Sequence, residues 1–134
     1  MFYSRDEKLS LLSEMIQFAK ADNNFKEMEY NFILAVAEQI GVSKEEVDSL
    51  KENKAEKKHL KPESQRILQF HRLVLLMNVD QEASDAELVS IKKIGLSMGL
   101  RPEAIDTVLE EMHNYPNKVI PPQELIAIFS RFYN

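Results

Sequence analysis

The chain has 134 residues, of which 44% are hydrophobic and 29% charged, and its formal net charge is −5. This length suits one domain with a single hydrophobic core, and the acidic balance argues against a general nucleic-acid-binding protein. The absence of cysteine excludes disulfides, thiolate metal sites and cysteine nucleophiles. The charged first residues and short apolar runs predict no signal peptide and no membrane span, so a cytoplasmic protein is expected.

Helical periodicity runs through the chain and predicts an all-α fold of about seven helices. The first helix is expected over about residues 5–20, where apolar residues recur at helical spacing. The second is expected over about residues 27–40, and Gly41 stands where a helix C-cap favours positive φ. Ser43 and Glu46 form the pattern of a capping box, which starts a short third helix.

A lysine-rich segment, about residues 51–63, is interpreted as a linker. Two interpretations of its charges remain open, a solvated helix end with a loop and a docking patch for an anionic partner. Its lysines outnumber its glutamates and are Lys51, Lys54, Lys57, Lys58 and Lys61.

The second half predicts the same sequence of elements. Pro62 can open a fourth helix that runs to about Asn78. Ser84 and Glu87 form another capping box and start a fifth helix, which Gly99 ends. Pro102 then opens a sixth helix. His71, on the fourth helix, is interpreted as a partly buried packing residue.

The chain resembles itself at an offset of 58 residues. Apolar positions of the first helix fall on apolar positions of the fourth, and we infer two copies of one supersecondary unit. The shift also brings together identical residues, namely Asp22 and Asp80, Glu29 and Glu87, Ile33 and Ile91, Gly41 and Gly99, Glu45 and Glu103, and Asp48 and Asp106.

The predicted organisation is therefore one domain over residues 1–134. Repeat one covers about residues 5–53 and repeat two about residues 62–113, with the linker between them. A C-terminal helix over about residues 122–133 is placed outside the repeat, where it would cover an apolar seam. Its expected apolar face consists of Leu125, Ile126, Phe129 and Phe132.

Each copy carries an acidic turn in which an aspartate is followed, seven residues later, by a glutamate at the start of a helix. The pairs are Asp22 with Glu29 and Asp80 with Glu87. An EF-hand is excluded, because its loop needs a glycine at the sixth position and a glutamate at the twelfth.

This layout resembles the TerB-like family, which includes the tellurite-resistance TerB proteins and a domain of the DjlA co-chaperones. Ala21-Asp22-Asn23 and Gly41-Val42-Ser43 match the family pattern in the first copy, and Val79-Asp80-Gln81 and Gly99-Leu100 match it in the second. The resemblance implies an all-helical, bacterial, cytosolic protein related to stress responses, without an established enzymatic activity. It also implies that acidic residues hold a divalent cation. Asn23 and Gln81 depart from the pattern, which has glycine there.

The four acidic residues Asp22, Glu29, Asp80 and Glu87 are the candidate metal ligands. Their oxygens favour Ca²⁺ or Mg²⁺, and pseudo-two-fold symmetry would bring the two turns to a common surface. Purely structural roles are the alternative, since turn aspartates bond nearby backbone and capping-box glutamates close helix starts.

The leading functional hypothesis is a non-enzymatic TerB-like domain that binds a divalent cation, a protein partner of unknown identity, or both. A metal-free helical interaction or oligomerisation module is the second hypothesis, and a metal-dependent hydrolase is the third. No histidine lies in the acidic turns to assist such a hydrolase. The sequence leaves the oligomeric state open.

Overall fold

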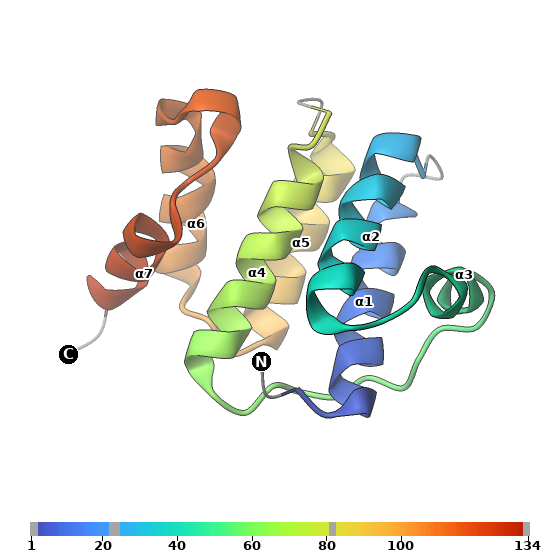
Figure 1. Cartoon of the computed structure of the whole chain (residues 1–134). Helices are drawn as coiled ribbons and strands as arrows, with labels where there is room; N and C mark the ends of the chain where they lie inside the picture. The colour runs from blue at the N-terminus through green and yellow to red at the C-terminus, as the bar shows by residue number, and fades with distance from the viewer. Residues whose placement is uncertain (1–2, 22–24, 81–82, 133–134) are drawn as a thin grey trace.

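The structure is a computed structural model that describes residues 3–21, 25–80 and 83–132. These residues form an all-α fold, as predicted, and no strand occurs among them (Figure 1). Two short 3-10 helices, η1 (Met112–Asn114) and η2 (Pro116–Lys118), follow the sixth α-helix. The α-helices are α1 (Arg5–Ala19), α2 (Glu27–Ile40), α3 (Lys44–Glu52), α4 (Glu63–Met77), α5 (Asp85–Ser97), α6 (Pro102–Glu111) and α7 (Pro122–Ser130).

Three of the described helices, α1, α3 and α5, begin at a serine capping box. Both capping boxes predicted from the sequence are present, at Ser43 with Glu46 and at Ser84 with Glu87. A third, which was not among the predicted boxes, starts α1, where Ser4 Oγ accepts from the Glu7 backbone N–H at 3.1 Å. Each box satisfies backbone donors that the first turn of a helix leaves unpaired.

Helix ends are matched between the copies. Gly41 and Gly99 follow α2 and α5 with φ of 80° and 79°, the left-handed conformation that glycine adopts without strain. The residue after each glycine donates its backbone N–H to the carbonyl five residues earlier, at 2.8 Å in the first copy and 3.1 Å in the second. The predicted glycine stops are therefore correct.

The helix starts keep the offset seen in the sequence. α4, α5 and α6 begin at residues 63, 85 and 102, each 58 residues after α1, α2 and α3 at residues 5, 27 and 44. α7, the helix predicted to lie outside the repeat, begins at residue 122, 59 residues after α4. Because α4 contacts both α1 and α7, the last helix continues the same progression (Figure 1).

The core is shared by both halves of the chain. Leu12, Met15 and Phe70 are fully buried in it, and the ring of Phe70 meets that of Phe129 edge-on at 6.1 Å. α7 contributes Leu125, Ile128 and Phe129. Two members of the predicted apolar face differ. Ile126 is 40% exposed, because the helix turns it to solvent and buries Ile128 in its place. Phe132 lies beyond the helix, which ends at Ser130 and not at about residue 133, although it packs against the core.

The linker is packed against α1 instead of being solvated throughout. α3 extends to Glu52, and residues 54–60 then cross α1 without forming a helix. Ser13 Oγ accepts from the Ala55 backbone N–H at 3.1 Å, and Ser10 Oγ accepts from that of Lys58 at 2.8 Å. Leu60 is buried. The loop backbone is therefore anchored, while most of its lysine side chains are exposed.

Candidate functional site

The two acidic turns lie at the same end of the helical array. The chain passes from α1 to α2 and from α4 to α5 at the upper end in Figure 1. Lys26, in the first turn, forms an ion pair with Asp80, in the second, through Nζ and Oδ2. This contact joins residues 54 positions apart in the sequence and brings the two turns together.

Glu29 and Glu87 occupy equivalent buried positions, each 4% exposed. Glu29 Oε1 accepts from the Lys26 backbone N–H at 3.0 Å, and Glu87 Oε1 accepts from that of Ser84 at 3.0 Å. Ser84 Oγ returns the bond by accepting from the Glu87 backbone N–H at 3.0 Å. Lysine has no side-chain acceptor, so the first copy has only the glutamate half of this arrangement.

The predicted site residues therefore have three different placements. Asp22 lies outside the described residues, Asp80 pairs with Lys26, and Glu29 and Glu87 close helix starts. Within residues 3–21, 25–80 and 83–132, three or more histidine, aspartate or glutamate side chains do not gather in a way that could hold a metal ion. Binding of Ca²⁺ or Mg²⁺ by the four acidic residues stays a prediction.

A second polar site surrounds Glu14, a residue that no pattern in the sequence predicts as functional. Glu14 Oε1 accepts from Gln69 Nε2 at 3.1 Å, and the same nitrogen donates to the Leu11 carbonyl at 3.1 Å. Burial raises the pKa of Glu14, against the opposing effects of the Gln69 hydrogen bond and the nearby Lys57 and His59.

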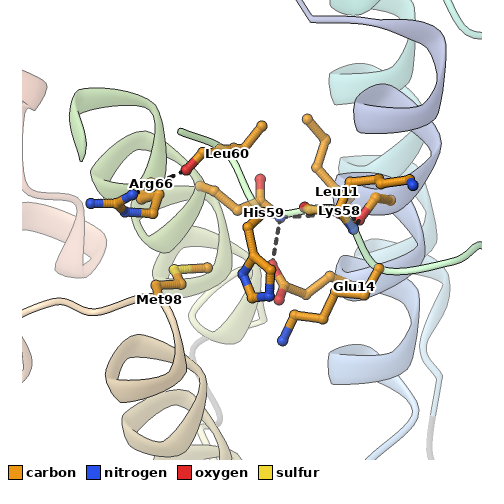
Figure 2. A pocket seen from close by; sticks show the side chains of 10 residues that line it. Leu11, Glu14, Lys58, His59, Leu60, Arg66 and Met98 are labelled. Atoms are coloured by element: carbon orange, nitrogen blue, oxygen red, sulfur yellow. Dashed lines mark hydrogen bonds between the residues drawn. The ribbon is translucent and has the colours of Figure 1, made fainter. Parts of the chain in front are cut away.

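The hollow beside Glu14 is small and lies between α1, the linker and α4. In Figure 2, Glu14 and the imidazole of His59 lie side by side, with Met98 on the opposite side of the hollow. Its volume is about 30 Å³, room for about one water molecule. Glu14 stands next to the apolar stripe of α1, but its burial depends on the linker crossing that helix. No local pattern in the sequence predicts such a crossing.

Comparison with known proteins finds a match to one protein family. Residues 2–52 match the family model of the tellurite resistance protein TerB. Searches of curated proteins and of solved structures found no match. The matched residues contain α1, α2, α3 and the first acidic turn, so the resemblance drawn from the sequence is confirmed over this segment. Among the described residues, no helix has the length and apolar character needed to cross a membrane.

Proposed function

We propose that this TerB-like chain is a non-enzymatic cytoplasmic domain that binds a divalent cation where its two acidic turns meet. The observation that supports the proposal is the Lys26–Asp80 ion pair, because it brings the two turns together at one end. A role in tellurite resistance or a related stress response would follow from the family resemblance.

The ion pair also suggests how the site would work. The ammonium of Lys26 already neutralises Asp80, and Ca²⁺ would take its place beside the carboxylate. Lys26 is the partner that would leave, since its side chain is 31% exposed, whereas that of Asp80 is 14% exposed. Cation binding to the folded state alone stabilises it by mass action.

Thermal melting with and without about 1 mM calcium tests the proposal. We expect calcium to raise the melting temperature of the parent and to raise it further in Lys26→Met, which removes the competing ammonium. Asp22→Asn/Asp80→Asn should abolish the response. Lys92→Met is the matched control, because Lys92 pairs with Asp106 at 3.6 Å away from the turns. A parent that calcium leaves unmoved would contradict the proposal, as would a double variant that responds like the parent.

A metal-free protein-interaction module is the second candidate. It is favoured by the capping bonds of Glu29 and Glu87, which give both carboxylates a structural role. In this case neither the parent nor Lys26→Met responds to calcium, and Asp80→Asn lowers stability only by about 0–1 kcal/mol through loss of an ion pair.

A further inference from the structure

A groove of about 640 Å³ lies on the molecule between α1, α5 and the linker. This volume is within the range of ligand sites, about 300–1,000 Å³. Its apolar lining comes from both halves of the chain, with Phe18 from α1, Ala55 from the linker and Ile94 from α5. Its polar lining includes Glu14, Gln17 and Ser90 from the helices and Lys54, Glu56 and Lys57 from the linker.

The equivalent groove of the second copy is smaller and has bulkier walls. Gln17 and Ser90 line the large groove, and the 58-residue shift relates them to Leu75 and Phe32. These two larger apolar residues line a hollow of about 300 Å³ between α4, α2 and the segment before α7. Val119, in the segment before α7, also lines this second hollow. The fold therefore does not require an open groove, and small or polar residues keep the first one open.

The α1 side of the groove already holds one segment of non-helical chain. Ser13 and Ser10 accept the backbone N–H groups of Ala55 and Lys58. Glu14 and Gln17 continue the same polar side of α1 into the groove. Their oxygens are acceptors of the kind that a second peptide segment needs for its backbone N–H groups.

Charge indicates what such a segment would carry. Lys54 and Lys57 line the groove with exposed side chains, and no ion pair of either is found within the described residues. Glu56 instead pairs with Lys58 at 3.5 Å. Carboxylates of a bound segment would meet the two lysines, while its backbone would face Glu14, whose own charge repels acidic side chains.

We propose that this groove binds an extended acidic segment of a partner protein, with an apolar side chain against Ile94 and Ala55 and flanking carboxylates at Lys54 and Lys57. This site is separate from the acidic turns, and it stands whether or not the turns bind calcium. It assigns a role to the lysine-rich linker and to the half-buried carboxylate of Glu14.

The test is an NMR titration of the full chain with a capped peptide of about six residues in which glutamate alternates with leucine. We expect amide shifts confined to residues 10–18 and 54–58 and to α5 around Ser90 and Ile94. Lys57→Glu should weaken binding by about tenfold, because it reverses a charge that the peptide contacts. Lys61→Glu is the matched control, since Lys61 is an exposed linker lysine that does not line the groove, and it should change affinity less than about twofold.

Filling the groove provides an independent variant. Ser90→Phe introduces the residue found at the equivalent position of the first copy, Phe32, and should abolish binding. The amide chemical shifts of the free variant outside the groove should match those of the parent, which shows that it is folded. The proposal is overturned if the acidic peptide causes no shifts at about 1 mM, or if its shifts lie outside the groove. Equal binding by a peptide with lysine in place of glutamate would also overturn it. If Ser90→Phe does not fold, the two lysine variants decide the question.

Discussion

The two halves of the chain share their helix boundaries and differ in what fills the space between helices. Glu29 and Glu87 are buried alike, and Gly41 and Gly99 end their helices with almost the same φ. The segments that leave the two repeats are held differently, by serine hydroxyls over α1 and by the imidazole of His71 over α4. The glycine stops and the buried glutamates are thus common to both copies, while the other caps and the positions between helices differ in chemistry.

Removal of α7 should have the largest effect. If α7 covers α4 as α4 covers α1, a chain that stops after Ile120 loses the buried Leu125, Ile128 and Phe129. Burial of three such side chains contributes about 5 kcal/mol or more, comparable with the whole stability of many domains. Urea unfolding or thermal melting measures the loss. Ile126→Ser, on the exposed side of the same helix, should change stability by less than about 0.5 kcal/mol. Equal melting of full and shortened chains would show that α7 is dispensable.

The packing between α5 and α6 is tighter than its counterpart in the first copy. Gly95 is equivalent to Ala37, and a Cβ at Gly95 would lie 2.6 Å from Ile105 Cδ1 and 3.1 Å from Phe70 Cε1. Gly95→Ala should therefore destabilise the fold by about 1–3 kcal/mol, despite the better helix propensity of alanine.

Ala37→Gly is the matched control for this close approach. It should lower the free energy of unfolding by about 1 kcal/mol, because it loses helix propensity and a buried methyl group and relieves no crowding. Chemical denaturation of both variants gives the comparison. A more stable Gly95→Ala would show that α5 and α6 have room for the methyl group.

His71 should make the second copy sensitive to pH. Its Nε2 bonds to the Ile120 carbonyl at 2.9 Å, and burial lowers its pKa below the ordinary 6.5, with the carbonyl acting in the opposite direction. The unfolded chain then takes up the proton more readily than the folded one. The contribution of neutral His71 is fully present above about pH 6.5 and is lost as the pH falls below it, with a slope of at most about 1.4 kcal/mol per pH unit.

His71→Gln isolates this effect, because an amide can donate to the same carbonyl and does not titrate. Unfolding free energies of parent and variant at several pH values between about 5 and 8 should diverge on the acid side. Parallel curves would mean that His71 titrates alike in the folded and unfolded chain. Ser13, its counterpart in the first copy, cannot titrate in this range and should contribute no such slope.

Replacement of Glu14 should have the smallest effect. Its raised pKa means that the folded state holds the proton more tightly than the unfolded chain. The contribution of protonated Glu14 to stability is therefore fully present below the ordinary pKa of 4.5 and is lost as the pH rises through the folded pKa. Glu14→Gln should therefore raise stability at neutral pH, by about 1 kcal/mol or less. Glu110→Gln, at an exposed position of α6, should change little. A Glu14→Gln variant that is less stable would show that its charge supports the linker.

Much of the fold followed from local signals in the sequence. Ser43, Ser84, Gly41 and Gly99 determine helix ends through bonds to nearby backbone, so their positions could be predicted. Ile126 could not be separated from Ile128 in the same way, because several helix faces of α7 carry apolar residues. Glu14 was missed because its burial comes from a segment more than 40 residues away in the chain. The Lys26–Asp80 contact is likewise a product of tertiary packing.

A calcium titration followed by two-dimensional NMR shows whether the two acidic turns form one cation-binding end. We expect amide shifts in both turns at the same calcium concentration, with Lys26 and Asp80 among the most affected residues and little change near α7. Absence of shifts up to several millimolar calcium, or shifts in only one turn, would contradict it.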